Sequence, residues 1–192
     1  MRLFVAVDLD DALRRAAARL SRTIRDRLER AGSFGVSWIA PDNLHLTLKF
    51  LGEIGDAAAG RIQEAMAAPF AEPVFDLELS DVGAFPPAGP ARVVWFGVRA
   101  GAEALVRLQT EVETRLRGFG LPPEDRPFRA HLTVARFRAP VPGRVRELLA
   151  VEAPVPIGRC SVRHVTLYQS HLSPKGARYV VLARAPLGGT GA

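Results

Sequence analysis

Two stretches of this sequence determine the fold and the chemistry that it predicts: His45-Leu46-Thr47-Leu48 and His131-Leu132-Thr133-Val134. Both run histidine, apolar residue, threonine, apolar residue, which is the two-residue period of a β-strand. In a strand the histidine and the threonine share one face, about 7 Å apart, while the apolar side chains face a core. The sequence therefore predicts two strands that each present an imidazole and a hydroxyl.

The segments around these stretches repeat in order. Alternating or apolar runs predict strands at residues 2–8, 43–51, 74–82, 92–99, 129–137, 162–170 and 177–184. Apolar stripes predict helices at residues 13–28, 56–66, 105–116 and 143–150. A Pro/Gly-rich stretch, residues 85–90, separates two halves that each carry one of the histidine stretches. This order predicts two similar units that face one another across a central cleft.

The composition is that of a folded chain. Of 192 residues, 48% are hydrophobic and 24% are charged, which suits one sizeable domain and excludes general disorder. No apolar run is long enough for a membrane helix, and the first such run ends at Asp8, which argues against a signal peptide. A single cysteine, Cys160, cannot form an internal disulfide; we expect it to be buried and the protein to be cytoplasmic.

The charge is strongly biased toward arginine. The chain carries 26 basic and 20 acidic residues, a formal net charge of +6, and Lys49 and Lys175 are its only lysines. Arginine pairs with phosphate in a bidentate way, so this bias fits binding of RNA or another polyanion. A GC-rich coding bias accounts for it equally well, and charge alone leaves the two explanations open.

Two imidazoles that face one another suit displacement at phosphorus. Histidine titrates near pH 6.5, so one ring can accept a proton from the nucleophile while the other protonates the leaving oxygen. The hydroxyls of Thr47 and Thr133 can donate to the non-bridging oxygens, and a nearby arginine can neutralise the charge that develops there. The residues themselves do not decide which histidine is the acid.

The sequence resembles the 2H phosphoesterases, which are named for two His-x-Thr-x motifs, and is most similar to their RNA 2′,3′-cyclic phosphodiesterase (2′-5′ RNA ligase-like) branch. The similar stretches are residues 2–9, 43–52, 126–128, 131–136 and 167–170, followed by Tyr179. The resemblance implies a single domain over residues 1–192 of α+β class. It would have two pseudo-symmetric lobes around a V-shaped cleft, each an antiparallel sheet with helices outside.

The resemblance also implies roles and a substrate. His45 would be the proton donor, His131 the proton acceptor, and Thr47, Thr133 and Arg136 the phosphate ligands. The substrate would be RNA with a 2′,3′-cyclic phosphate end, such as a tRNA fragment, or a cyclic nucleotide, and the product a 2′-phosphomonoester. No cofactor, metal or membrane is implied, and we expect a monomer.

Strict alternation places Arg136 on the face opposite His131, so a bulge or the end of the strand must turn it inward. Alternation also places Lys49 beside Thr47, where it could bind anions, and Phe50 in the core. Phe50, Trp38 and Tyr168 are nevertheless candidates for stacking on a base. His164 and His171 match no repeated motif, and we assign them no chemistry.

Three alternatives remain open at this point. A metal site would need further ligands, since catalytic zinc usually takes three and neither histidine has a carboxylate or cysteine at ligand spacing. A non-catalytic module could bind RNA ends or nucleotides with the same residues. The same chemistry run in reverse would join a cyclic end to a 5′-hydroxyl, forming a 2′-5′ linkage, although water competes as the nucleophile.

Overall fold

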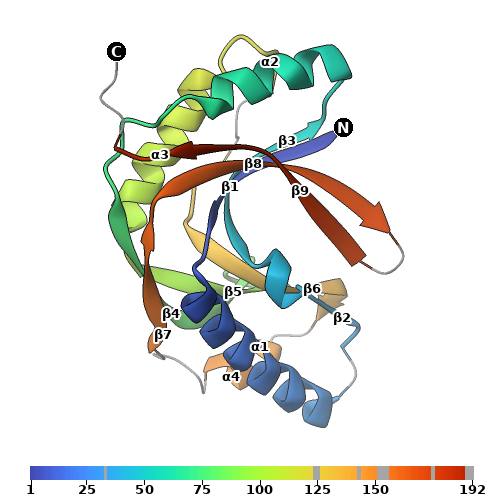
Figure 1. Cartoon of the computed structure of the whole chain (residues 1–192). Helices are drawn as coiled ribbons and strands as arrows, with labels where there is room; N and C mark the ends of the chain where they lie inside the picture. Colours follow the sequence, from blue (N-terminus) through green and yellow to red (C-terminus); the bar gives the residue numbers. More distant parts are fainter. Residues whose placement is uncertain (33, 123–125, 142–143, 151–155, 174–175, 189–192) are drawn as a thin grey trace.

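Two antiparallel sheets organise the computed structural model of this chain, which describes all residues except 33, 123–125, 142–143, 151–155, 174–175 and 189–192 (Figure 1). The four-stranded sheet has the order β3 (His45–Glu53), β1 (Arg2–Asp8), β8 (His164–Ser173), β9 (Gly176–Pro186). The five-stranded sheet has the order β2 (Val36–Trp38), β6 (His131–Val141), β5 (Ala91–Ala100), β4 (Phe75–Phe85), β7 (Pro156–Val162). The predicted α+β class with two antiparallel sheets is confirmed.

Helices cover both sheets. Two helices lie beside the five-stranded sheet: α1 (Asp11–Ala31), which contacts β7, and α4 (Arg144–Ala150), which contacts β4 (Figure 1). Two others lie beside the four-stranded sheet: α2 (Asp56–Ala67), which contacts β9, and α3 (Ala102–Arg115), which contacts β3. A 3-10 turn, η1 (Pro41–Asn43), precedes β3. None of the helices described is long and apolar enough to cross a membrane.

The longest helix, α1, shows how the sequence specifies these elements. Asp10 caps its first turn by accepting a hydrogen bond from the Leu13 backbone N–H at 2.7 Å. Leu13, Ile24 and Leu28 then recur at helical spacing and are buried, which turns the remaining, arginine-rich faces toward solvent. The predicted amphipathic helix is therefore present, and it is longer than its apolar stripe.

The two sheets do not correspond to the two halves of the sequence. β4 lies in the five-stranded sheet beside β5. Phe85 ends β4 and residues 86–90 connect these two paired strands, so the prediction that residues 85–90 separate two units is wrong. The predicted final hairpin, β8 and β9, returns to pair with β1. Antiparallel neighbours joined by a short connection lose little chain entropy, which favours the β4–β5 pairing over a boundary.

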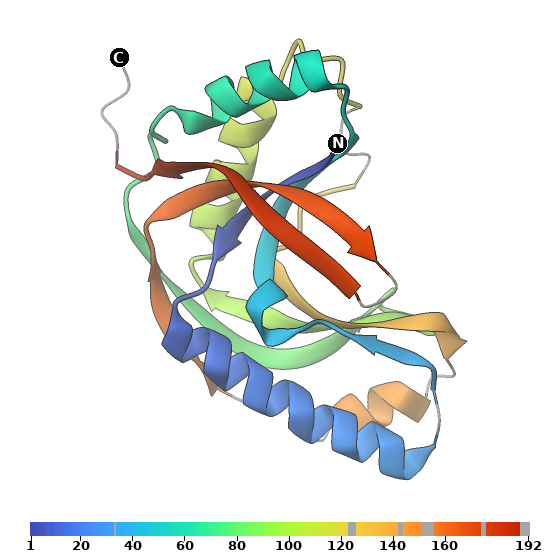
Figure 2. The same ribbon diagram turned by 45° about the vertical axis from the view of Figure 1, so that its right-hand side comes forward.

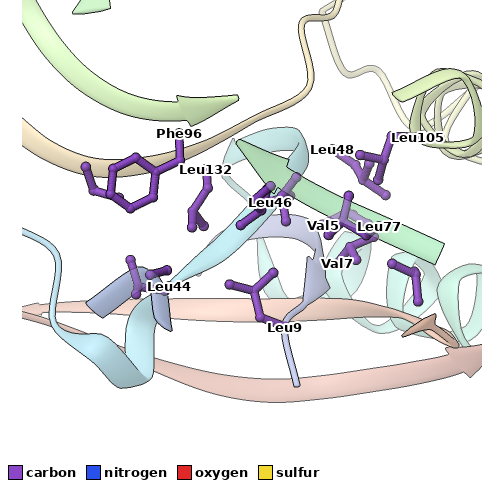
Figure 3. Close-up of a cluster of buried hydrophobic side chains, with 14 of the residues drawn as sticks. Val5, Val7, Leu9, Leu44, Leu46, Leu48, Leu77, Phe96, Leu105 and Leu132 are labelled. Carbon is purple, nitrogen blue, oxygen red and sulfur yellow. The ribbon is translucent and has the colours of Figure 1, made fainter. Parts of the chain in front are cut away.

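One apolar cluster joins the two sheets. It includes Val5 and Leu46 from the four-stranded sheet together with Leu77, Phe96 and Leu132 from the five-stranded sheet (Figure 3). Because the apolar residues of both motif strands are anchored in this cluster, their polar residues are held on the opposite face.

Candidate active site

Strands β3 and β6, which carry the two motifs, come from different sheets and contact one another. Together they line a cavity of about 760 Å³, which we call the central cleft. Thr47 and Phe50 contribute from β3, and His131, Thr133 and Arg136 contribute from β6. The structure thus brings residues 86 positions apart in the sequence, Thr47 and Thr133, into one cavity.

The two histidines are held in the same way. Each Nδ1 lies 2.7 Å from the backbone carbonyl oxygen two residues earlier, that of Asn43 for His45 and that of Arg129 for His131. A carbonyl oxygen only accepts, so Nδ1 carries the proton and Nε2 is left with its lone pair. Nε2 of His45 lies 3.0 Å from the Thr47 hydroxyl oxygen, which links this ring to the cleft. Both rings are therefore oriented to exchange a proton at Nε2.

The pKa values of both imidazoles lie below the usual histidine value. Burial is the main cause for each ring, and the positive charge of Arg136 lowers both pKa values further. Hydrogen bonds to the backbone carbonyls oppose this shift, and the Asp8 carboxylate also raises the pKa of His45. One guanidinium therefore acts on both rings, while a carboxylate acts on His45.

A β-bulge follows the threonine in each motif. Thr47 pairs with Ala6 and Lys49 with Val5, so Leu48 is an extra residue. In β6, Thr133 pairs with Trp95 and Ala135 with Val94, so Val134 is the extra residue. Each bulge resets the alternation of faces, so the third residue after the threonine shares its face.

These bulges decide where three predicted residues lie. Arg136 lines the cleft, because the bulge that its inward orientation requires is present. Phe50 also lines the cleft and is 56% exposed, so the prediction that it belongs to the core is wrong. Lys49 also lines the cleft, but it is only 2% exposed and its Nζ donates to Glu113 Oε1 at 2.7 Å, so its charge is paired with a carboxylate and the structure does not support the predicted anion-binding role.

A second cavity, about 560 Å³, adjoins His45, and we call it the His45 hollow. The carboxylate of Asp8, which pairs with His45 in the sheet register, lies in its wall. It accepts hydrogen bonds from the Thr166 hydroxyl at 2.8 Å, from Arg184 Nη2 at 3.1 Å and from the Tyr168 hydroxyl. The sequence alone does not indicate Asp8 as a site residue, since only the pairing of β1 with β3 reveals its position.

Aromatic rings pack around both histidines. The Phe4 ring lies 4.8 Å from that of His45, and Phe85 makes an edge contact with His131 at 5.0 Å. Tyr168 stacks on Phe4 at 5.1 Å, and burial raises the pKa of its phenol. These rings contribute to the burial of the imidazoles, which is the main cause of their lowered pKa values.

The remaining predicted residues lie elsewhere. Trp38 lines a third cavity, beside α1, and not the central cleft. His164 lines the His45 hollow, His171 is exposed, and Cys160 is buried as predicted. Among the residues that the structure describes, no group of three or more His, Cys, Asp or Glu side chains is arranged to hold a metal ion.

The chain resembles known proteins over almost its whole length. A family model described as the 2′-5′ RNA ligase superfamily matches residues 9–174. A curated Archaeoglobus fulgidus protein named RNA 2′,3′-cyclic phosphodiesterase is 40% identical over 179 residues, 93% of this chain and 96% of that protein. The crystal structure of TT0787 of Thermus thermophilus matches with a TM-score of 0.76 and 32% identity, covering 98% and 99% of the two chains. That of E. coli LigT complexed with 3′-AMP matches with a TM-score of 0.72 and 28% identity, covering 97% of each.

Proposed function

Because this chain belongs to the 2′-5′ RNA ligase superfamily, we propose that it hydrolyses RNA-terminal 2′,3′-cyclic phosphodiesters to 2′-phosphomonoesters without a metal ion. The family resemblance read from the two motifs is confirmed, and curated relatives at 27% to 40% identity carry the name RNA 2′,3′-cyclic phosphodiesterase. The observation that carries the proposal is the arrival of Thr47, Thr133 and His131 in one cavity, with His45 bonded to Thr47.

The proposed reaction is an in-line displacement at phosphorus. His131 Nε2 takes a proton from water as the water oxygen forms a bond to phosphorus. The bond from phosphorus to the ribose 3′-oxygen breaks, and a protonated His45 donates its Nε2 proton to that oxygen. The phosphate stays on the 2′-oxygen, and exchange with solvent returns each histidine to its starting protonation state.

Three side chains are proposed to stabilise the transition state. The Thr47 and Thr133 hydroxyls donate to the non-bridging oxygens, and the guanidinium of Arg136 neutralises the charge that accumulates on them. Phe50 exposes its ring in the same cleft, where it can stack on the terminal base. Every proposed group is supplied by β3 or β6.

The surroundings of the two rings favour His45 as the acid. The register places the Asp8 carboxylate opposite His45, but Gly97 opposite His131. A neighbouring carboxylate stabilises the imidazolium, as the opposing effect of Asp8 on the pKa of His45 indicates. At the matching position, Gly97 has no side chain to stabilise a charged His131. Burial lowers the pKa of both rings, and the Asp8 carboxylate is the charged group that opposes this shift at His45 and not at His131.

An assay of the purified protein with 2′,3′-cyclic nucleotides and cyclic-ended RNA in the presence of EDTA tests this proposal. We expect hydrolysis to a 2′-phosphate, and a loss on the order of 10²-fold or more in kcat for His45→Ala and for His131→Ala. The exposed His171 provides the matched control: His171→Ala should retain activity.

Circular dichroism and thermal melting would establish that the variants fold. Wild-type turnover by the double His45→Ala, His131→Ala variant would refute the mechanism. Loss of activity in EDTA that returns with added metal would refute metal independence, and a 3′-phosphate product would show that the other ester oxygen leaves.

A further inference from the structure

The third cavity is an arginine-rich groove of about 520 Å³ between α1 and the segment that joins β2 to η1; we call it the α1 groove. Figure 2 shows this segment running alongside the helix. Arg15, Arg19 and Arg22, at helical spacing along α1, are exposed and line the groove. None of the three makes a side-chain hydrogen bond or ion pair with another residue that the structure describes. Three adjacent guanidinium groups are therefore free to bind an anion.

A buried hydroxyl also lines this groove. Ser21 is 8% exposed, and its Oγ has no hydrogen-bond partner among the described residues, a costly arrangement for a buried polar group. The half-buried indole of Trp38 lies in the same wall. Guanidinium groups and an aromatic ring together match the phosphates and bases of a nucleic acid strand.

The α1 groove adjoins the His45 hollow. Arg14 and Asp42 line both cavities, so the two meet at the N-terminal end of α1. The hollow adds Arg163 and Arg178, whose side chains are exposed and form no ion pair within the described part of the chain. Two aspartates, Asp11 and Asp42, line the α1 groove against five arginines, so its charge remains positive.

The proposed chemistry fixes the side of the cleft from which the RNA leaves. If His45 protonates the 3′-oxygen, the ribose lies on the His45 side of the phosphorus, and the attacking water lies on the His131 side. We therefore expect the RNA chain attached to that ribose to leave past His45. The His45 hollow is the cavity on that side, and it shares Arg14 and Asp42 in its lining with the α1 groove.

We propose that the His45 hollow and the α1 groove bind the single-stranded RNA chain that leads to the cyclic end, with Arg15, Arg19 and Arg22 on its phosphates and Trp38 on a base. This inference rests on the proposed function and on His45 as its acid. It predicts that the protein distinguishes an RNA end from a cyclic mononucleotide, because only a chain of several nucleotides reaches the groove.

The test compares an Arg19→Ala, Arg22→Ala double variant with an Arg99→Ala, Arg117→Ala double variant, which removes the same charge from exposed positions outside all three cavities. The substrates are a 2′,3′-cyclic mononucleotide and a cyclic-ended RNA of about ten nucleotides, within the usual span of single-strand sites. We expect the groove variant to lose about tenfold in kcat/KM on the RNA at low salt. Its kcat/KM on the mononucleotide should be unchanged.

Binding of the same RNA, followed by fluorescence anisotropy across a salt series, separates this inference from the proposed function. Loss of two phosphate contacts should reduce the slope of log K against log salt by about 1.4, and the control variant should keep the wild-type slope. Equal losses in both variants, or a loss confined to an Arg92→Ala, Arg126→Ala variant of the central cleft, would overturn the inference. A wild-type protein that binds this RNA through the groove but hydrolyses neither substrate would instead refute the proposed function alone.

Discussion

The two motif strands, β3 and β6, hold their histidine and threonine in the same way but differ at the positions that distinguish the two sides of the site. Both hold a histidine by an Nδ1 bond to the carbonyl two residues earlier, and both have a bulge after the threonine. After the bulge β3 continues Lys49-Phe50, whereas β6 continues Ala135-Arg136. The shared histidine and threonine positions suit the two sides of the proposed phosphate substrate. The differing positions place the guanidinium of Arg136 on β6 and the exposed ring of Phe50 on β3.

The same comparison holds for the strands that pair with the motifs. Asp8 lies opposite His45, and Gly97 lies opposite His131. The two imidazole rings therefore have similar backbone contacts but different electrostatic surroundings, as separate acid and base roles require. The following variants change one side of the site at a time.

The largest effect is expected from Arg136→Ala, which removes the cation from the β6 side. Loss of a group that stabilises transition-state charge should lower kcat by on the order of 10²-fold. Because the positive charge of Arg136 lowers the pKa of both histidines, its removal should also move both limbs of the pH–rate profile to higher pH. Steady-state kinetics across pH measures both effects.

Arg138→Ala is the matched control, because Arg138 is exposed on the same strand and lines none of the three cavities. Arg136→Lys keeps the charge and should keep the wild-type profile while recovering part of kcat. An Arg136→Ala enzyme with normal kcat and an unshifted profile would contradict the role given to this strand position.

The residues that precede Phe50 and Arg136 are Lys49 in β3 and Ala135 in β6. The difference between them can be tested through the stability of the fold. Lys49 is buried against Glu113, so Glu113→Ala should leave a buried charge with a single carbonyl partner, that of Pro122, and destabilise the fold by about 3 kcal/mol. Lys49→Met, which removes the buried charge itself, should cost about 1 kcal/mol or less. Urea unfolding measures both values.

Turnover per folded molecule should stay near the wild-type value in both variants, because neither side chain is proposed to touch the phosphate. A Lys49→Met protein that unfolds normally but loses substrate affinity would instead favour an anion-binding lysine.

The sequence predicted the polar face of each motif, because two-residue alternation is local information. It could not predict Phe50 and Lys49, because a bulge depends on the register between two strands and leaves no mark in the composition of one. The position of Asp8 was hidden for the same reason. The placement of β4, β8 and β9 was missed because it depends on long-range pairing, which a repeated order of elements does not determine. The sequence predicted that Arg136 would face inward only if the strand had a bulge or ended near it, and the structure has that bulge.

The smallest and most diagnostic change is Asp8→Asn, which makes the two sides more alike. Asp8 raises the pKa of His45, so its neutralisation should lower that pKa and leave the pKa of His131 nearly unchanged. If His45 is the acid, the alkaline limb of the kcat/KM profile moves to lower pH, the acidic limb stays, and activity at neutral pH falls by up to about tenfold, since one pKa unit is a factor of ten. Asp42→Asn is the control, a carboxylate of the same hollow that does not contribute to the shift at His45. Movement of the acidic limb instead would exchange the two roles, and the RNA chain would then have to leave on the side of His131.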